Sequence, residues 1–393
     1  MRPIASIEDA RRIAKRRLPR LAYDYIAGGA EDEVTLRANR RAFEQVTLRP
    51  SYLVDVSARD QSTTIFGHRI ASPVIIAPTG LSRLAGRDGD VAGARAAGRR
   101  DTIFTHSCMS SHSLEEVARA GAGPLWFQIF LWQDRDLIEG QIRRAKDAGY
   151  HALVFTVDSP VVGKRQRDLR NGFTLPPRPT LRTALDMLRR PRWLAQSRTP
   201  IAFRNFDASG STSPAKTIAR ATYINQVLWN PGATYADLAW LREAWTEPLL
   251  VKGVLTAEDA ERAVACGVDG VIVSNHGGRQ LDGAPATLDA LPEIARAVGG
   301  RADVFLDGGI RRGGDVVKAL ALGAKACMIG RPWLYGLASG DEDGVVHILE
   351  ILHEEIDRTL ALIGRRALDD LDPSVVGRAA AGQIGRPPLV AAP

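Results

Sequence analysis

Cysteine is scarce in this chain of 393 residues, which contains only Cys108, Cys266 and Cys327. Three thiols cannot all pair with one another, and two of them lie in helical or strand patterns, where a free cysteine behaves as a small buried hydrophobic residue. The sequence therefore excludes a disulfide-rich secreted scaffold, and we expect a reducing, cytoplasmic compartment.

Long hydrophobic runs are missing as well. No stretch approaches about 18 consecutive apolar residues, so we expect no transmembrane helix. Residues 1–19 lack the apolar core of a signal peptide, and Glu8 and Asp9 argue against a transit peptide. The net charge of +7 is compatible with nucleic acid, membrane headgroups or an acidic ligand, and does not by itself choose among them.

What the sequence does contain is a repeated spacing. Gly149, Gly267 and Gly323 each follow a helical pattern, and each is followed seven residues later by the end of a buried apolar run. Glycine is typical of a helix C-terminal cap, so each unit is predicted to be a helix, a tight turn and a buried parallel strand. Repeated units of this kind predict a parallel sheet covered by helices.

Eight apolar runs are candidate strands with helical patterns between them. They are Val74–Pro78, Thr102–Ser107, Leu125–Phe130, Ala152–Val157, Leu249–Lys252, Gly270–Ser274, Asp303–Asp307 and Ala326–Gly330. Eight strands favour a closed TIM (β/α)8 barrel of the α/β class over a doubly wound sheet, and no G-x-G-x-x-G follows a strand, which argues against a dinucleotide fold. We predict a single domain over residues 1–393, with the barrel in residues 71–370 and an extended tail in residues 374–393.

Two regions lie outside the barrel pattern. Residues 1–70 are predicted to form an N-terminal helical extension, in which Ser6 and Asp9 make a capping box and Pro19 stops the first helix. Residues 160–234 form a long insertion between strands 4 and 5.

Part of that insertion, about residues 178–200, combines apolar and basic side chains at helical spacing. The apolar ones are Leu181, Ala184, Leu185 and Leu188, and the basic ones are Arg182, Arg189, Arg190, Arg192 and Arg198. Two interpretations fit this pattern equally: a basic, solvated helix that packs on the barrel, or a segment that lies in a membrane interface.

The most informative segment is Ser274–Asp282, which directly follows the buried run Gly270–Val273. A neutral His276 can take a proton, and Arg279 can hold a carboxylate with its two-pronged donor geometry. The two glycines between them let the backbone come close to a ligand. A lone histidine at this position could equally be a capping or core residue. The residues at the other strand ends therefore decide whether His276 is functional.

In a TIM barrel the active site lies at the C-terminal ends of the strands. The polar and glycine residues at these ends are Thr79, Gly80, Ser107, Gln128, Thr156, Asp158, Lys252, Ser274, Asp307, Gly308, Gly309, Arg311, Gly330 and Arg331. The glycines and arginines after strands 7 and 8 are typical of a phosphate site, although the glycines alone could simply turn the chain. A phosphate site without a dinucleotide fingerprint indicates a mononucleotide, and the hydroxyl and amide groups of strands 2 to 4 suit the edge of a ring such as flavin.

Two charged side chains each have two interpretations. Lys252 is either a Schiff-base nucleophile or a cation beside a cofactor, and its many hydrogen-bonding neighbours favour the cation. Asp158 either hydrogen-bonds His276 and stabilises its protonated form, or caps the loop after strand 4.

Long, ordered motifs over nearly the whole chain resemble the FMN-dependent 2-hydroxy acid oxidases and dehydrogenases, which include glycolate oxidase, lactate oxidase and dehydrogenase, and mandelate dehydrogenase. The matching motifs are Tyr23–Ala30, Ala77–Gly80, Thr156–Asp158, Lys252–Gly253, Ser274–Asp282, Leu306–Gly313 and Ile329–Pro332. The resemblance implies an FMN enzyme that oxidises an (S)-2-hydroxy acid to the 2-oxo acid, with flavin N5 as hydride acceptor. We expect neither a metal site nor a nucleic-acid partner.

The resemblance also assigns roles, with His276 as the base, Asp158 as its support and Lys252 beside flavin N1 and O2. The catalytic set would be His276, Asp158, Lys252, Arg279, Arg165 and Tyr25. The substrate would contact Tyr25, Arg165, His276, Arg279, Phe130 and Met109, with the two arginines on its carboxylate. FMN would contact Pro78, Thr79, Gly80, Ser107, Gln128, Thr156, Lys252, Ser274, Asp307, Gly308, Gly309, Arg311, Gly330 and Arg331.

Three residues bear on the substrate. Phe130 stands where the family usually has a tyrosine whose hydroxyl faces the substrate, so either transition-state stabilisation is weaker or the substrate differs. Met109 replaces the large aromatic residue of glycolate oxidase, which leaves room for a bulky, mandelate-like acid. Gly80 and the long insertion resemble the mandelate and bacterial lactate dehydrogenases, in which the insertion includes a membrane-associating segment.

Those last two features favour a dehydrogenase that passes electrons to a quinone over an oxidase that uses O2. They also predict peripheral contact, through about residues 178–200, with the inner face of the cytoplasmic membrane, and the family resemblance suggests a homotetramer. Two other interpretations stay open: an FMN enzyme for another substrate, such as a biosynthetic intermediate or a modified peptide, and a non-redox FMN barrel. The presence of His276, Arg279 and Arg165 together argues against the non-redox barrel.

Overall fold

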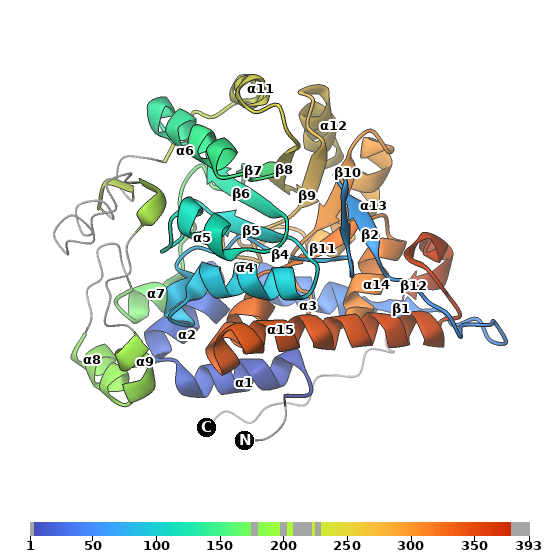
Figure 1. Ribbon diagram of the computed structural model, residues 1–393, viewed down its shortest axis with the longest axis horizontal. Coiled ribbons are helices and arrows are strands. Elements are labelled where there is room, and N and C mark those ends of the chain that lie inside the picture. Colours follow the sequence, from blue (N-terminus) through green and yellow to red (C-terminus); the bar gives the residue numbers. More distant parts are fainter. Residues whose placement is uncertain (1–3, 174–179, 197–202, 207–221, 225–228, 379–393) are drawn as a thin grey trace.

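The structure is a computed structural model that describes residues 4–173, 180–196, 203–206, 222–224 and 229–378. At its centre, eight parallel strands form a closed barrel, in which β11 pairs with β4 to complete the ring (Figure 1). The strands are β4 (Val74–Ile76), β5 (Phe104–Ser107), β6 (Leu125–Phe130), β7 (Ala152–Thr156), β8 (Leu249–Val254), β9 (Gly270–Val273), β10 (Asp303–Leu306) and β11 (Ala326–Ile329). The predicted TIM barrel is confirmed, and all eight candidate runs are strands of it.

The barrel strands are buried on both faces, as a parallel sheet covered by helices requires. The helices around it are α4 (Gly89–Arg99), α5 (Leu114–Ala120), α6 (Arg135–Asp147), α11 (Tyr235–Ala244), α12 (Ala257–Ala265), α13 (Thr287–Val298), α14 (Gly313–Ala321) and α15 (Arg331–Leu362). Helices α6, α12 and α14 each end two residues before the glycine that predicted their ends, namely Gly149, Gly267 and Gly323.

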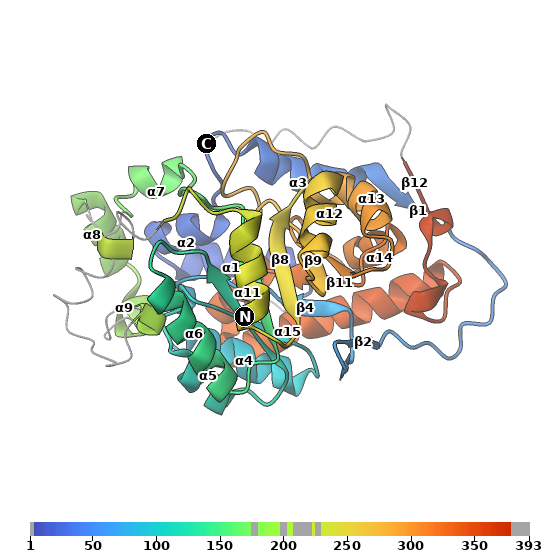
Figure 2. The ribbon, with the colours of Figure 1, turned by 90° about the horizontal axis from the view of Figure 1, so that it is seen from above.

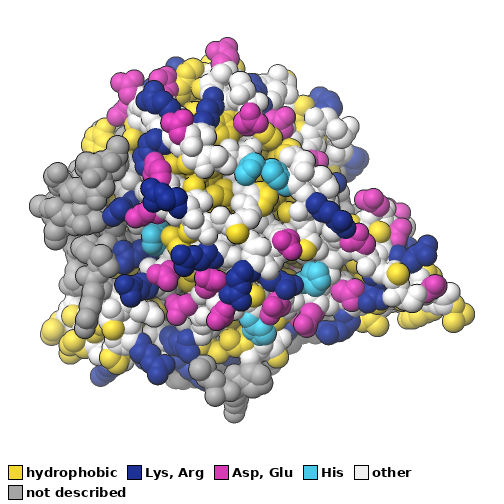
Figure 3. Space-filling view, viewed as in Figure 1, with side chains coloured by type: hydrophobic (Ala, Val, Ile, Leu, Met, Phe, Trp, Pro, Cys, Tyr) yellow, Lys and Arg dark blue, Asp and Glu magenta, His cyan; other side chains and the backbone are white. Residues whose placement is uncertain are grey.

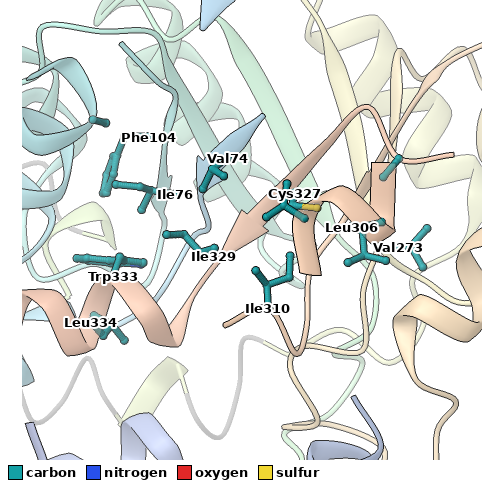
Figure 4. Packing of buried hydrophobic residues seen from close by; sticks show 14 of the residues in the cluster. Val74, Ile76, Phe104, Val273, Leu306, Ile310, Cys327, Ile329, Trp333 and Leu334 are labelled. Atoms are coloured by element: carbon teal, nitrogen blue, oxygen red, sulfur yellow. The ribbon is translucent and has the colours of Figure 1, made fainter. Parts of the chain in front are cut away.

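The packing between strands and helices is aromatic and aliphatic. Figure 4 shows Trp333 of α15 beside Ile76 and Phe104, and its ring meets that of Phe104 edge-on at 6.0 Å between centroids. Cys327 lies in the same layer and, like Cys108, is buried, whereas the third cysteine is partly exposed; all three are free thiols.

The N-terminal extension begins with three helices: α1 (Ile7–Arg17), α2 (Arg20–Ala27) and α3 (Val34–Gln45). Ser6 is the N-cap of α1, because Ser6 Oγ accepts a hydrogen bond from Asp9 N at 3.2 Å. The predicted capping box is only half formed, because the Asp9 carboxylate bonds the Ser6 hydroxyl at 2.7 Å and not its backbone N–H. Pro19 lies between α1 and α2, and α1 packs along α15 at the lower edge of the molecule in Figure 1.

The prediction that residues 1–70 are helical is wrong after Gln45. The chain there forms β1 (Val46–Leu48) and the hairpin β2 (Thr63–Ile65) and β3 (His68–Ile70). Ile65 and Ile70 are fully buried against interior residues of the barrel, including Trp126 and Phe305. The hairpin therefore contributes side chains to the core inside the barrel. Each strand of the hairpin has only three residues, too few for the two-residue alternation of a strand to be recognised in the sequence.

The predicted tail from residue 374 also begins with ordered structure. The last strand, β12 (Val376–Arg378), pairs antiparallel with β1. Two short helices, η4 (Leu368–Asp370) and η5 (Pro373–Val375), precede β12, and residues 379–393 of the predicted tail lie outside the described residues. The pairing partner is more than 300 residues away in the chain, so no local pattern could indicate it.

The long insertion connects β7 to β8 and carries α7 (Gln166–Arg170), α8 (Leu181–Leu188), α9 (Pro191–Gln196) and η2 (Arg204–Phe206). Both Figure 1 and Figure 2 place α8 and α9 at the edge of the molecule, away from the barrel strands. Hydrogen bonds that attach this part of the insertion to the rest of the molecule include those from Arg20 N to Asp186 at 2.6 Å, from Trp193 Nε1 to Leu84 O at 2.9 Å and from Arg190 Nε to Leu18 O at 3.3 Å.

Helix α8 presents apolar side chains to the surface. Leu181, Leu185 and Leu188 are 79%, 50% and 67% exposed. Figure 3 shows hydrophobic and basic side chains side by side at the lower left of the molecule, where α8 lies. Of the predicted interfacial segment, residues 178–179 and 197–200, with Arg198, lie outside the described residues, as does the side chain of Arg182. No helix among the described residues is long and apolar enough to cross a membrane.

Candidate functional site

A cavity of about 530 Å³ opens at the C-terminal ends of the barrel strands. The predicted site residues that line it are Tyr25, Pro78, Thr79, Gly80, Ser107, Met109, Gln128, Phe130, Thr156, Arg165, Lys252, His276, Arg279, Asp307, Gly308, Gly309, Arg311, Gly330 and Arg331. The other two predicted residues, Asp158 and Ser274, are not part of the lining but contact His276 and Lys252. The structure therefore brings the whole predicted set into one place.

Three neighbouring strands contribute a row of polar side chains to the cavity. Ser107 Oγ donates to Gln128 Oε1 at 2.9 Å, and Gln128 Nε2 donates to Thr156 Oγ1 at 3.0 Å. The three side chains point inward because they alternate with outward residues along parallel, paired strands. The row is buried and presents donors and acceptors that match the polar edge of a planar ring.

Lys252 is a buried cation at the cavity floor. Its Nζ lies 3.0 Å from Asp307 Oδ2 and donates to Ser274 Oγ at 2.8 Å. Burial alone would lower the pKa of Lys252, but the charges of Asp307 and Asp158 raise it above its usual value. Lys252 is therefore protonated, which excludes the Schiff-base nucleophile in this state and suits a cation beside an anionic ring.

The loops after β10 and β11 form the other end of the cavity. Gly309 has φ of +87°, and a Cβ there would lie 2.5 Å from Asn39 O, so only glycine fits. Thr79 Oγ1 and Asp307 Oδ1 are buried without a hydrogen-bond partner among the residues that the structure describes. Burial lowers the pKa of Arg331 to about 9, with the charge of Arg279 adding to the shift. Unpartnered oxygens and crowded cations fit the hydroxyl chain and phosphate of a mononucleotide.

His276 is held in a strained and well-defined position. Its φ of +56° is in the left-handed region, which is uncommon for a residue other than glycine and is concentrated at functional sites. Its Nδ1 lies 2.9 Å from Asp158 Oδ1, which confirms the predicted hydrogen bond. Neutral His276 donates from Nδ1 to this carboxylate, and Nε2 is left with a lone pair that can accept a proton.

The protonation states of this pair suit a base. Burial lowers the pKa of His276 below its usual value, although the charge of Asp158 opposes the shift. Burial would raise the pKa of Asp158, but His276 and Lys252 together hold it below its usual value. At neutral pH the histidine is therefore unprotonated beside an ionised carboxylate.

Two arginines meet at the mouth of the cavity. Arg279 donates to Tyr25 O at 2.6 Å and to Gly28 O at 3.2 Å, and its guanidinium lies 4.9 Å from the centre of the Tyr25 ring. Burial lowers the pKa of Arg165 to about 10, and the nearby charge of Arg279 contributes. Two adjacent, half-buried cations leave a position whose natural complement is a carboxylate.

One wall of the cavity is aromatic. Phe130 stacks on His276 at 6.4 Å between ring centroids and 14° between planes, and Trp229 packs on Phe130 at 5.2 Å. Beside them, Met109 approaches Gly80 so closely that a Cβ on that glycine would lie 3.0 Å from Met109 Cβ. This end of the cavity is apolar and suits a hydrophobic side chain.

Sequence reasoning missed several residues of the cavity lining. Trp229, Phe173, Phe203 and Ile224 all line the cavity and all come from the long insertion. They follow no strand end and no helical period, and only a run of aromatic residues within the insertion could have drawn attention to them.

Two residues of the Ser274–Asp282 segment support the scaffold instead of lining the cavity. Asn275 and Asn39 exchange amide hydrogen bonds, both at 2.8 Å. Asp282 accepts hydrogen bonds from Asp32 N, Val34 N and Thr35 N, which satisfies the free N–H groups at the start of α3. The segment thus ties the N-terminal extension to the site that it carries.

Comparisons with known proteins find relatives that match nearly the whole chain. Glycolate oxidase 1 of Zea mays is 43% identical over 372 residues, which cover 94% of this chain and 95% of the relative. A putative L-lactate dehydrogenase of Mycobacterium tuberculosis is 42% identical over 386 residues, 97% of this chain and 91% of that protein. A crystal structure of the monotopic membrane protein (S)-mandelate dehydrogenase superposes with a TM-score of 0.90 at 41% identity, over 95% of this chain and 99% of that one.

The family model of the FMN-dependent dehydrogenases matches residues 14–378, so the chain belongs to this family. Its cofactor is FMN, and its activity is the FMN-dependent oxidation of 2-hydroxy acids.

Proposed function

We propose that this enzyme oxidises an (S)-2-hydroxy acid with an aromatic or otherwise bulky side chain, such as mandelate, to the 2-oxo acid. The observation that carries the proposal is the aromatic lining of the cavity, where Phe130 and Trp229 pack on each other and Phe173 packs on Tyr25, in the same cavity as His276 and the arginine pair. An apolar pocket of this kind favours a large side chain over a hydrogen or a methyl group by the apolar area that binding buries.

Each part of the substrate then has a place. Arg165 and Arg279 bind the carboxylate, with the Tyr25 hydroxyl beside them, and the α-hydroxyl lies at His276 Nε2. Phe130 and Met109 contact the side chain. FMN is held by Pro78, Thr79, Gly80, Ser107, Gln128, Thr156, Lys252, Ser274, Asp307, Gly308, Gly309, Arg311, Gly330 and Arg331.

Oxidation of the substrate removes the proton of the α-hydroxyl group. It also removes the hydrogen of the α-carbon together with two electrons. His276 Nε2 accepts the hydroxyl proton, and Asp158 stabilises the imidazolium that results. Bound FMN supplies the acceptor for the α-hydrogen and its two electrons. Lys252, which stays protonated, stabilises negative charge that develops on the ring.

A substrate panel tests the proposal. Under anaerobic conditions the yellow enzyme is mixed with glycolate, lactate or mandelate in a stopped-flow instrument, and bleaching of the flavin is followed. We expect mandelate to give the highest ratio of the limiting rate of flavin reduction to the substrate dissociation constant. Preference for glycolate would contradict the proposed substrate class, and failure of all three acids would favour a non-standard substrate.

Phe130→Tyr provides a second test on the same panel. A tyrosine would return a hydroxyl donor to the substrate end of the cavity, where negative charge develops on the substrate oxygen. One such hydrogen bond is worth roughly 1.5–3 kcal/mol, or about tenfold or more in rate. We expect faster bleaching by a 2-hydroxy acid, and Phe130→Leu serves as the matched control without a hydroxyl. A slower reaction with every acid would indicate that Phe130 is an apolar wall for another substrate.

We further propose that α8 and α9 touch the inner face of the cytoplasmic membrane and that a membrane quinone, in preference to O2, reoxidises the flavin. The exposed Leu181, Leu185 and Leu188 support this proposal, since each would bury apolar area in the interface. Replacing all three by glutamine should weaken binding to anionic phospholipid vesicles by about tenfold or more. Leu362→Gln, at another exposed leucine, should not; equal loss in both would contradict the assignment.

The homotetramer is proposed on the family resemblance. The loop that carries Tyr52 and Leu53 protrudes from the molecule, and their side chains are 80% and 106% exposed. An apolar loop of this kind is typical of a surface that another subunit covers. Light scattering should give four times the chain mass of 42.6 kDa, and a monomer would contradict the proposal.

A further inference from the structure

Asp90 is a buried carboxylate that the proposed reaction does not use. It lies in the first turn of α4, outside the cavity lining, and its side chain is 1% exposed. Its Oδ2 accepts hydrogen bonds from the hydroxyls of both Ser82 and Ser110. Burying an ionised carboxylate destabilises the fold unless hydrogen bonds or opposite charges compensate. We therefore expect a structural role for Asp90 in what its partners hold together.

The two serines belong to two different loops of the cavity. Ser82 begins the short helix η1 (Ser82–Leu84), two residues after Gly80, and Ser110 directly follows Met109. The loops also touch in front of Asp90, where Leu81 N donates to Met109 O at 3.2 Å. The loop after β4 and the loop after β5 therefore share one carboxylate behind the cavity wall.

The charge of Asp90 makes these bonds strong. Burial would raise its pKa, but His112 and His106 hold it below its usual value, and His112 Nδ1 lies 3.8 Å from Asp90 Oδ2. Ser110 Oγ in turn accepts from His112 N at 3.1 Å. Hydrogen bonds to an ionised acceptor are shorter and about twice as strong as neutral ones, so the serines are held closely.

Asn205 fixes the same loop from the other side. Its Nδ2 donates to Ser107 O and Cys108 O, both at 3.3 Å, and its Oδ1 accepts from Leu114 N at 2.8 Å. The loop after β5 is thus bonded at both ends. In its middle, next to Met109, Ser110 Oγ joins it to Asp90, in addition to the backbone bond from Leu81 N to Met109 O. A change at Ser110 should therefore move Met109 while leaving the ends in place.

We propose that Asp90, with Ser82 and Ser110, is a clamp of positioning residues that sets the distance between Gly80 and Met109. That distance decides how much room the substrate side chain has beside the flavin, so the clamp is a determinant of substrate size. The inference rests on the proposed function, which places the substrate side chain against Met109.

The test uses the FMN-loaded enzyme and two variants of neighbouring serines. Ser110→Ala removes one clamp bond, whereas Ser111→Ala removes a buried hydroxyl of the same size that has no partner among the described residues. For both, kcat and KM are measured with mandelate and with lactate. We expect Ser110→Ala to keep its FMN and to change the ratio of the two kcat/KM values about tenfold, mainly through KM, because a misfit of about one methylene has this effect. Ser111→Ala should keep the wild-type ratio.

Asp90→Asn supplies a second variant, which keeps the shape of the side chain and removes its charge. It should change the ratio in the same direction as Ser110→Ala. Equal ratios in Ser110→Ala, Ser111→Ala and the wild type would overturn the clamp, whatever happens to stability. A wild-type enzyme that accepts lactate and glycolate but not mandelate would instead overturn the proposed substrate class, and the ratio of those two acids would then report on the clamp.

Discussion

Replacing His276 by glutamine is expected to slow anaerobic flavin reduction by about 10²–10⁴-fold while FMN stays bound. The residue lies beside the arginine pair with Nδ1 bonded to Asp158, so only Nε2 can receive the hydroxyl proton. Glutamine has a similar length but no group that accepts a proton at neutral pH. Stopped-flow bleaching measures the rate, and the visible flavin absorbance measures the bound cofactor.

The pH dependence separates base chemistry from damage to the backbone. Because the active form is neutral and the pKa of His276 is lowered, the wild-type rate should persist through neutral pH and be lost only as pH falls below the usual histidine range. His276→Asn, which tolerates the left-handed backbone better, should be as slow as the glutamine variant. His347→Gln, at a histidine on the surface of α15, should behave as the wild type. A near-normal rate of flavin reduction in His276→Gln would contradict the assignment of His276 as the base.

Lys252→Met should slow flavin reduction by about 10²–10³-fold, the usual cost of removing one group that stabilises developing negative charge. The ammonium is buried and protonated, and its 3.0 Å contact with Asp307 fixes it at the cavity floor. Methionine has a similar shape without the charge. The variant also leaves Asp307 and Asp158 without their common cation, so FMN is supplied in excess and the rate is measured at saturation.

A second lysine controls for the change of charge in the cavity. Lys164 lines the same cavity but is exposed, and Lys164→Met removes an equal charge from its rim. We expect this variant to reduce its flavin nearly as fast as the wild type, because water screens an exposed charge. If both variants lose the same factor, or if Lys252→Met reacts normally, Lys252 is not the cation that supports the reduced ring.

Local patterns predicted the barrel and most of its site. Glycines such as Gly267 and runs such as Gly270–Val273 are signals within one helix or one strand, and a parallel barrel places every strand end on the same face. The hydrogen bond between Asp158 and His276 was therefore predictable from two strand ends, although they are 118 residues apart. The same logic explains why the hairpin β2–β3 was missed, since its short strands belong to no repeated unit.

By itself, the sequence determined the class of protein, the eight strands and the set of residues at their ends, because these depend on local periodicity and on ordered motifs. Only the tertiary structure decided what surrounds that set. Trp229 reaches the cavity from the insertion, Asp282 bonds the start of α3, and Asp90 joins Ser82 to Ser110 from behind the wall. Each of these contacts is made between segments that no local period relates, and each exists because barrel closure brings distant loops to one end of the molecule.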